Sequence, residues 1–302
     1  SLFLDSRKLA TVATDYRWPV NWNNSRAQVG SGNFGDSVMQ LDEFYLYSRL
    51  QNIEDLRAKL WLPIQDRSQD HSRVNPNIPS IYNDVKVHGA EDYSEVIARL
   101  GATLFRDPIL SRNQSVSCQS CHGVNNAFAD NKAFSIGLYG DTTRRNSPVI
   151  FNRIFSTKQF HDGRAHSLDA QMLMPIENAV EMDLTTNEAV LRLREHRQYD
   201  QAFKNTFGQS ATAENLQKAL AHYVRSLIAE PSREDQDLLD LEERLGKNIF
   251  EQKANCIACH KGSNFSDEAF HDVGLRLNGD LGLAEITGRD SDTGKFKTPT
   301  LR

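Results

Sequence analysis

Two copies of one short pattern decide the fold class of this chain: Cys118-Gln-Ser-Cys121-His122 and Cys256-Ile-Ala-Cys259-His260. They use all four cysteines of the 302-residue chain. C-x-x-C-H is the attachment signature of c-type haem, in which both thiols bind the porphyrin and the histidine is the proximal ligand of the iron. The alternatives are a thioredoxin-like dithiol, which does not require the histidine, and a four-cysteine zinc site, which usually has closer spacing. We therefore expect two covalently bound haem c groups.

Composition places the chain among ordinary globular proteins. Charged residues make up 25% of it and the net charge is −5. The basic residues are scattered, so no nucleic-acid footprint is expected. The longest apolar stretch, residues 219–229, contains His222 and Arg225 and is far shorter than the ~20 residues that a membrane span requires. The chain begins with Ser1 and no signal-like apolar region follows, so we expect either a processed chain or an excised piece, whose own targeting signal cannot be read. Haem attachment, rather than disulfide bonding, indicates the periplasm or an equivalent oxidising compartment.

An internal repeat surrounds the two motifs. Arg99-Leu100-Gly101 matches Arg244-Leu245-Gly246 before them, and Phe128-Ala-Asp130 matches Phe265-Ser-Asp267 after them. Apolar periodicity predicts helices over residues 95–105, 214–229 and 238–250, each with a face that we expect in the core. These faces carry Val96, Leu100 and Leu104; Leu216, Leu220, Tyr223, Val224 and Leu227; and Leu238, Leu241, Leu245 and Ile249.

The fold expected from this pattern is mostly α-helical. It comprises two cytochrome-c-like haem domains related by the repeat, over residues 91–230 and 231–302, with long ordered loops. Residues 1–90 belong to neither copy and contain all three tryptophans, Trp18, Trp22 and Trp61. We expect them to form an extension that contacts the haem domains or a partner.

Several further phrases resemble the bacterial di-haem cytochrome c peroxidases and their relatives of the MauG type. The resemblance covers residues 96–302. It rests on Leu100-Gly-x-x-Leu-Phe-x-Asp-Pro108, Arg145-Asn-Ser-Pro148, Asp162-Gly-Arg164, Gln171-x-x-x-Pro175 with Glu181-Met182, and Lys297-Thr-Pro-Thr-Leu301. It implies that the first haem is the peroxidatic one, which reacts with hydrogen peroxide, and that the second haem passes electrons to it.

The resemblance also implies which side chains surround the distal side of the peroxidatic haem, namely Gln171, Pro175 and Glu181. Heterolytic cleavage of the O–O bond requires that a proton move from one oxygen of peroxide to the other. A carboxylate can carry that proton, first as a base and then as an acid. We expect Glu181 in that role, Gln171 as a hydrogen-bonding group for peroxide or water, and Pro175 as a shaper of the pocket. His122 and His260 are the expected proximal ligands.

Two positions depart from the pattern of the family. Many relatives close the resting peroxidatic haem with a histidine after the first motif, and that position is Leu138, with Tyr139 beside it. We therefore expect the first haem to be five-coordinate and open when fully oxidised. Where the family usually has a tryptophan between the haems, this chain has His161. His161 is either a hydrogen-bonding residue near haem propionates or a relay, and imidazole is harder to oxidise than the indole that it replaces.

The resemblance leaves other ligands to be assigned. No methionine or tyrosine follows Cys256, so the sixth ligand of the second haem is expected just beyond Arg302, with His271 as a weaker candidate. A calcium ion between the haem domains is implied, with the Asn146 side chain and the carbonyls of Lys297 and Pro299 as ligands.

Three functions follow from these features. The first is a periplasmic di-haem peroxidase that takes electrons from a small cytochrome c or a cupredoxin. The second is a MauG-like enzyme that uses peroxide to oxidise a side chain of a partner protein. The third is a non-catalytic di-haem electron carrier, against which an open haem beside a carboxylate argues. Members of the family are often dimers, so a homodimer is an open possibility.

Overall fold

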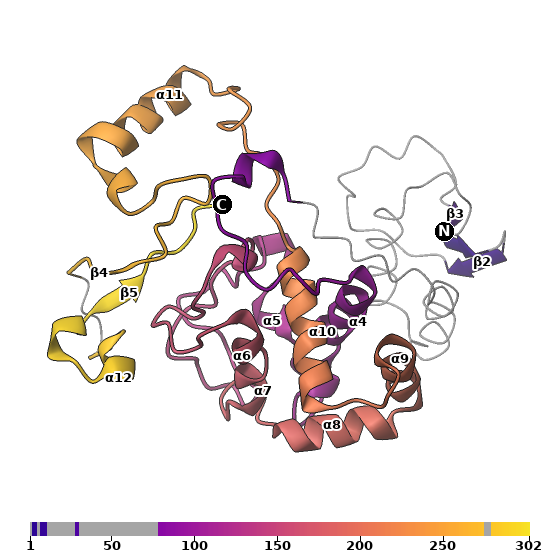
Figure 1. The fold of residues 1–302 in the computed structure, drawn as a ribbon. Helices are drawn as coiled ribbons and strands as arrows, with labels where there is room; N and C mark the ends of the chain where they lie inside the picture. Colours follow the sequence, from indigo (N-terminus) through magenta and orange to yellow (C-terminus); the bar gives the residue numbers. More distant parts are fainter. Residues whose placement is uncertain (1, 5–6, 11–27, 30–77, 275–278) are drawn as a thin grey trace. The chain divides into compact units, whose positions relative to one another are not determined.

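The computed structural model describes residues 78–274 and 279–302, together with the backbone of three short strands (Figure 1). These strands are β1 (Leu2–Leu4), β2 (Arg7–Ala10) and β3 (Gln28–Val29), in the order β2-β1-β3. Contacts divide the chain into two compact units, Ser1–Arg67 and Ser68–Arg302. Trp18, Trp22 and Trp61 lie outside the described residues, so the role expected for the extension stays a prediction.

The second unit is rich in helices and has little sheet in its described part, which confirms the mostly α-helical class. Its α-helices are α4 (Glu95–Arg106), α5 (Cys118–Cys121), α6 (Leu168–Met172), α7 (Met174–Glu177), α8 (Thr186–Glu195), α9 (Arg197–Phe207), α10 (Ala213–Ser226), α11 (Leu241–Asn248) and α12 (Ala284–Thr287). Its 3-10 turns are Ser80–Tyr82, Pro108–Leu110, Val124–Asn126, Arg153–Phe155, Cys256–Ala258 and Asp290–Asp292, and a π-helical turn spans Ile249–Lys253. Strands β4 (Phe270–Asp272) and β5 (Lys295–Lys297) pair antiparallel.

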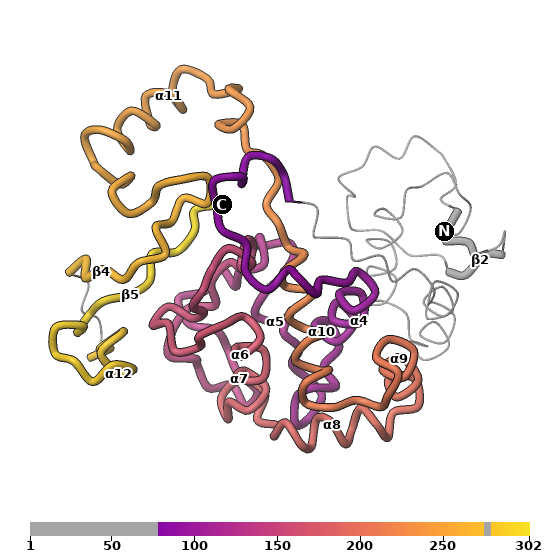
Figure 2. Tube along the Cα trace, in the orientation of Figure 1, coloured from indigo at the N-terminus to yellow at the C-terminus, as the bar shows by residue number. Residues whose placement is uncertain are grey.

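Helices α4 and α10 form the centre of the core. They are far apart in the sequence but lie side by side (Figure 2). Leu100 and Leu104 of α4 and Leu216 and Leu220 of α10 are almost fully buried, as their spacing predicts. Gly101 lies at the crossing, where an added Cβ atom would be 1.9 Å from the carbonyl oxygen of Ala219. The absence of a side chain at this position therefore lets the two backbones approach closely.

A pair of glycine substitutions tests this crossing. We expect Gly101→Ala to lower the free energy of unfolding by about 3 kcal/mol, because the new methyl group forces α4 away from α10. The control is Gly246→Ala, since Gly246 is the counterpart of Gly101 in the sequence repeat and has no atom within 4 Å of an added Cβ. It should leave stability unchanged or raise it by about 0.5–1 kcal/mol, because alanine favours helix. Urea unfolding measures both, and equal effects would contradict the close approach at Gly101.

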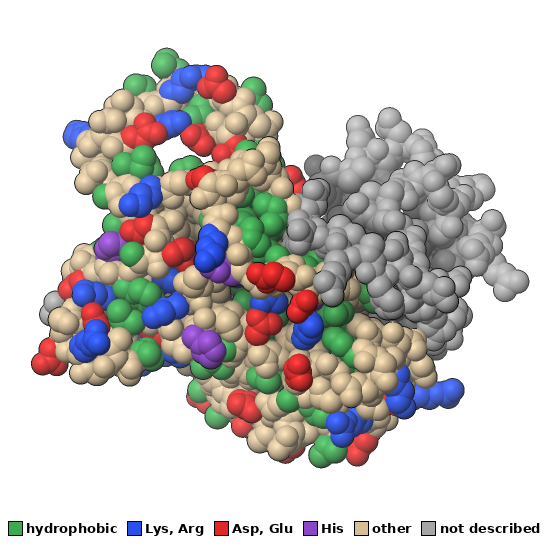
Figure 3. All heavy atoms as spheres, viewed as in Figure 1, with side chains coloured by type: hydrophobic (Ala, Val, Ile, Leu, Met, Phe, Trp, Pro, Cys, Tyr) green, Lys and Arg blue, Asp and Glu red, His purple; other side chains and the backbone are tan. Residues whose placement is uncertain are grey.

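The prediction of a buried face on residues 238–250 is wrong. Helix α11 and the π-helical turn form there, but their apolar side chains are exposed, and hydrophobic side chains lie at the surface of this part of the chain (Figure 3). These side chains are Leu238, Leu241, Leu245 and Ile249. Among the described residues α11 contacts mainly the turn that follows it. The periodicity is correct for a helix, but no described helix covers it as α10 covers α4.

Candidate active site

The first motif folds so that its thiols and its histidine come from one short turn. Ser117 precedes α5, and its N–H donates to the Ser120 hydroxyl at 3.0 Å. The His122 N–H then donates to the carbonyl of Cys118 at 2.9 Å. The Nδ1 of His122 lies 3.0 Å from the carbonyl oxygen of Phe128. A carbonyl can only accept, so Nδ1 carries the proton and Nε2 keeps its lone pair for a metal.

The second motif repeats these contacts. The His260 N–H donates to the carbonyl of Cys256 at 3.0 Å, and Nδ1 of His260 lies 3.0 Å from the carbonyl oxygen of Phe265. Phe128 and Phe265 both have left-handed backbones, with φ of 57° and 46°. Each motif therefore presents two thiols and one imidazole whose Nε2 is left to bind iron, which fits the donor set of a c-type haem.

The described cysteines do not form a shared zinc site. Among the described residues, one group could hold a metal ion, namely Cys259, Asp267 and His271, and it contains no residue of the first motif. Haem attachment would use the thiol of Cys259 in that group. The Nε2 of His271 lies 2.9 Å from Oδ2 of Asp267, so these two members of the group already contact each other. Burial also raises the pKa of the Cys118 thiol to about 12, which disfavours the thiolate that zinc requires.

Glu181 lies in a tight turn that holds one of its carboxylate oxygens. The carbonyl of Asn178 accepts the N–H groups of Glu181, Met182 and Asp183 at 2.9–3.1 Å. The Asn178 side chain is itself fixed, because its Oδ1 accepts from the Val180 N–H at 2.9 Å. Its Nδ2 consequently donates to Oε1 of Glu181 at 2.8 Å. Oε2 is therefore the oxygen that remains to exchange a proton.

The electrostatics of Glu181 suit proton transfer. Burial raises the pKa of its carboxyl group, and the Arg164 charge partly opposes that rise. The carboxylate lies close enough to the first motif that its charge raises the pKa of both the Cys118 and the Cys121 thiol. Glu181 is therefore a half-buried acid on the side of the first motif, with a pKa nearer to working pH than that of an exposed glutamate.

The loop that carries Leu138 packs on this turn. The Leu138 N–H donates to the carbonyl of Val180 at 2.9 Å, and a Cβ atom on Gly137 would lie 1.9 Å from that same oxygen. Leu138 is 8% exposed, whereas Tyr139 is 60% exposed and donates its hydroxyl to Asp183 at 2.8 Å. The residue of the loop that packs on the turn of Glu181 is therefore Leu138, whose side chain cannot bind iron. The Tyr139 hydroxyl is hydrogen-bonded to Asp183 at the surface.

Gln171 and Pro175 come from the two short helices that lead into the turn. Ser167 caps α6 by accepting from the Ala170 N–H at 3.0 Å. Pro175 lies in the first turn of α7, where its missing N–H removes no helical hydrogen bond. Both residues are half-buried, and the Gln171 side chain makes no hydrogen bond with the described residues. Its amide is therefore available to a bound molecule.

Comparisons with known proteins decide the family. A family model described as di-haem cytochrome c peroxidase matches residues 95–243. The methylamine utilization protein MauG of Methylorubrum extorquens is 33% identical over 262 residues, which cover 83% of this chain and 69% of that protein. The cytochrome c551 peroxidase of Pseudomonas aeruginosa is 31% identical over 272 residues, covering 84% and 78%. This chain belongs to the di-haem cytochrome c peroxidase family.

The fold supports the same assignment. The crystal structure of a MauG-like protein associated with microbial copper homeostasis matches with a TM-score of 0.70 and 29% identity, covering 76% of this chain and 75% of that one. Family membership makes this protein an oxidoreductase that acts on peroxide and carries two haem c groups. Among the residues that the structure describes, no helix is long and apolar enough to cross a membrane.

His161 contacts strand β5, which follows the second motif in the chain. Its carbonyl accepts from the Lys297 N–H at 2.8 Å, and its ring centroid is 4.9 Å from that of Phe296. Burial, together with the positive charges of Arg145 and Lys297, lowers the pKa of His161, so the ring is neutral at pH 7. No described residue hydrogen-bonds to its imidazole.

Arg145 forms ion pairs with two acidic residues, one of them distant in the sequence. Its guanidinium donates two hydrogen bonds of 2.7 Å to Asp280, and it also pairs with the buried Asp162. Asp162 in turn pairs with Arg164, whose charge acts on Glu181. Asp162 and Arg164 therefore connect the Arg145–Asp280 ion pair with Glu181 on the side of the first motif.

The residues expected to bind calcium are not joined by any described hydrogen bond. Asn146 is exposed, and its Nδ2 donates to the carbonyl of Lys132 at 2.7 Å, while its Oδ1 has no hydrogen-bond partner among the described residues. The buried side chain of Lys297 pairs with Glu268 at 3.1 Å. Calcium takes six to eight oxygen ligands, so Asn146 and the carbonyls of Lys297 and Pro299 would need several more. The calcium site stays a prediction.

Asn178 is a site residue that the sequence reasoning missed. It lies between Pro175 and Glu181, within the phrase that carries the family resemblance. The signal available was its type, since asparagine often hydrogen-bonds to the backbone two residues on and so begins a turn. The Oδ1 contact with Val180 is of this kind.

Proposed function

We propose that this chain is a periplasmic di-haem peroxidase whose first haem reduces hydrogen peroxide with electrons that enter at the second. The observation that carries the proposal is Glu181, a half-buried acid held through one oxygen, beside a loop that presents Leu138 rather than a ligand. When bound, haem supplies the redox-active iron at which peroxide takes up two electrons and two protons and becomes two molecules of water. Cys118, Cys121 and His122 hold the first haem, and Cys256, Cys259 and His260 hold the second.

Glu181 moves the proton in this proposal. Its Oε2 would accept a proton from the peroxide oxygen nearer the haem and return it to the outer oxygen. The outer oxygen then leaves as water. The hydrogen bond from Asn178 to Oε1 keeps Oε2 turned toward the substrate. Gln171 donates or accepts a hydrogen bond to orient peroxide, since its amide has no described partner. Pro175 lies in the first turn of α7, the helix that leads into the turn of Glu181, and so shapes the pocket.

The second motif is the proposed entry point for electrons. Cys256 and the neighbouring Ile257 are exposed, so a small cytochrome c or a cupredoxin can approach this edge. The two haem domains, residues 91–230 and 231–302, are the proposed units of this relay. The matching contacts of His122 with Phe128 and of His260 with Phe265 support a repeat between them. A homodimer stays an untested prediction.

The runner-up is a MauG-like enzyme that oxidises a side chain of a partner protein. Leu138 favours it, because an open first haem needs no reductive activation. His161 counts against it, because imidazole holds an oxidising equivalent less readily than indole. A pure electron carrier is disfavoured, since it gains nothing from a half-buried carboxylate beside an open iron.

Cysteine-pair variants test the division of labour between the haems. We expect Cys118→Ser/Cys121→Ser and Cys256→Ser/Cys259→Ser each to retain one haem per chain by the pyridine haemochrome assay. The first variant should lose the spectral change that peroxide induces. The second should keep that change but lose turnover with reduced cytochrome c. A peroxide reaction that survives in the first variant and disappears in the second would reverse the assignment.

A further inference from the structure

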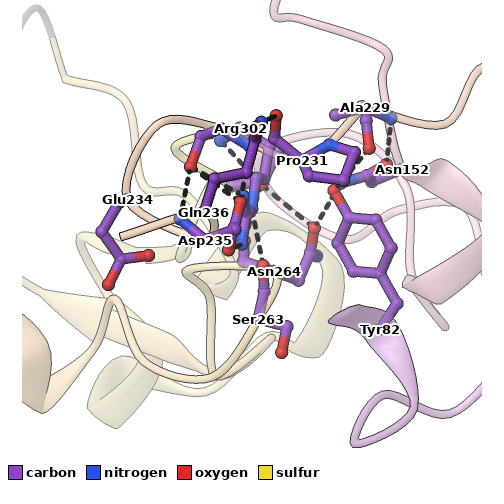
Figure 4. A network of polar contacts seen from close by, with 12 residues as sticks. Tyr82, Asn152, Ala229, Pro231, Glu234, Asp235, Gln236, Ser263, Asn264 and Arg302 are labelled. Carbon is purple, nitrogen blue, oxygen red and sulfur yellow. Dashed lines mark hydrogen bonds and ion pairs between the residues drawn. The ribbon is translucent and has the colours of Figure 1, made fainter. Parts of the chain in front are cut away.

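Asn152 is a buried side chain at the junction of four segments that are distant in the sequence. It is fully buried and precedes the 3-10 turn Arg153–Phe155. Its Oδ1 accepts from the Ala229 N–H at 2.9 Å, and its Nδ2 donates to the Tyr82 hydroxyl at 3.2 Å and to Oδ1 of Asn264 at 3.0 Å (Figure 4). Asn152 itself follows the first motif. Its amide thus connects that segment with Tyr82 near the start of the described residues, with Ala229 after α10 and with Asn264 in the loop after the second motif.

The orientation of this amide follows from its partners. The main-chain N–H of Ala229 can only donate, so the atom facing it must be the oxygen of Asn152, and Nδ2 must face Asn264. A donor facing Asn264 requires that Asn264 present its own oxygen. The Nδ2 of Asn264 then has no described partner, although Asn264 is 2% exposed. A buried donor without a hydrogen-bond partner costs free energy. That the Asn264 amide keeps this orientation nevertheless indicates that its contact with Asn152 is specific.

Asn264 belongs to the loop that fixes the second proximal histidine. It follows His260 by four residues and directly precedes Phe265, whose carbonyl holds the His260 imidazole at 3.0 Å. The Thr300 hydroxyl lies 2.6 Å from the carbonyl oxygen of Asn264 and 3.1 Å from its Oδ1. Arg302 donates to the neighbouring Ser263 carbonyl at 2.6 Å. The loop is therefore held on one side by the C-terminal segment and on the other by Asn152.

The backbone at position 152 suits this role. Its φ of 61° is left-handed, a conformation that asparagine and glycine adopt more readily than other residues. The Asn152 N–H also donates to the carbonyl of Leu227 at 2.8 Å. Both the main chain and the side chain of Asn152 therefore bind the segment after α10, and the side chain alone reaches the second motif.

We infer that Asn152 is a positioning residue that holds the loop carrying His260 against the first haem domain and so sets the rate of electron transfer between the haems. The inference rests on the proposed function, in which electrons pass from the second haem to the first. Electron transfer falls steeply with the separation of its two centres. Loss of the Asn152 amide should therefore slow this step without changing the proton-transfer group at Glu181.

Asn152→Gly tests the inference in the full-length holoprotein. Glycine tolerates the left-handed backbone, so the substitution removes the side-chain contacts without adding strain. We expect the inter-haem rate, measured by pulse radiolysis with optical detection of both haems, to fall about tenfold, as a loosened positioning contact predicts. The rate of the first haem with peroxide should stay unchanged. Potentiometric titration of both haems shows whether a change in driving force explains the result.

Two further variants keep the test decisive. Asn215→Ala removes another buried asparagine, in α10, whose side chain has no bond to the second motif, and it should leave the inter-haem rate unchanged. Thr300→Val removes only the hydroxyl that holds Asn264 from the other side, and it should also lower the inter-haem rate. It replaces Asn152→Gly as the test if that variant does not fold. An inter-haem rate as fast as wild type in Asn152→Gly, or in Thr300→Val if Asn152→Gly does not fold, would overturn the inference alone. A wild-type protein without inter-haem transfer would overturn the proposed function and the inference with it.

Discussion

Glu181→Gln should lower the rate constant for the reaction with hydrogen peroxide by about 10³-fold, the loss expected when a general acid–base group is removed. Glutamine keeps the size of the side chain and can still place an oxygen against Nδ2 of Asn178. It cannot accept a proton and return it, so the O–O bond would have to break without internal proton transfer. Stopped-flow spectroscopy of the first haem with peroxide measures this rate directly.

The pH dependence of the same reaction identifies the titrating group. Burial raises the pKa of Glu181, so the wild-type rate should rise with pH through an acid limb that lies above the ordinary glutamate value of about 4.3. The rate rises with pH because the ionised carboxylate of Glu181 is the form that accepts the first proton. The acid limb should disappear in Glu181→Gln and persist in Glu195→Gln, a matched change on the exposed end of α8. A glutamine variant that retains both the rate and the limb would remove Glu181 from the mechanism.

Leu138→His should close the first haem and slow its reaction with peroxide in the fully oxidised protein by about 100-fold. Position 138 is fixed by the hydrogen bond of its N–H to Val180 and by the packing of Gly137 on the same carbonyl. An imidazole held there can occupy the iron, and if it does so 99% of the time, the open fraction falls to about one hundredth. Half-reduction of the protein, which the family resemblance implies would release this ligand, should restore the rate.

Tyr139→His is the matched control for this substitution. Tyr139 is exposed and bonds to Asp183 at the surface, so a histidine there should leave the iron open and the rate unchanged. The opposite result, a closed haem in Tyr139→His and an open one in Leu138→His, would show that the assigned position in the loop is off by one residue. The electron paramagnetic resonance spectrum of each oxidised variant separates the two cases.

The local geometry around both cysteine motifs could be predicted from the sequence. C-x-x-C-H closes a short turn by itself, and in both copies the histidine N–H reaches the first cysteine carbonyl. Apolar periodicity likewise predicts helices over residues 95–105 and 214–229, and the helices form at Glu95–Arg106 and Ala213–Ser226, because a stripe of apolar side chains at this spacing is stable only when it is buried. The stripe of α11 shows the limit, since periodicity predicts a helix but not the element that covers it.

The contacts that orient the site could not be predicted in the same way. Asn152 and Asn264 are 112 residues apart, and Arg145 and Asp280 are 135 apart. No spacing rule connects such positions, because their meeting depends on how the whole chain folds. The residue type of Asn178 predicts a turn. That its Nδ2 donates to Glu181 while its Oδ1 accepts from Val180 is seen only in the folded structure.

The central claim is that the first haem is open to peroxide in the fully oxidised protein, with Glu181 ready to transfer the proton. Electron paramagnetic resonance and optical spectra of the air-oxidised holoprotein, before and after one equivalent of peroxide, test it most directly. We expect one high-spin and one low-spin haem and an immediate reaction of the high-spin one. Two low-spin haems that ignore peroxide until the protein is half-reduced would contradict the claim and would mean that a side chain other than Leu138 closes the iron.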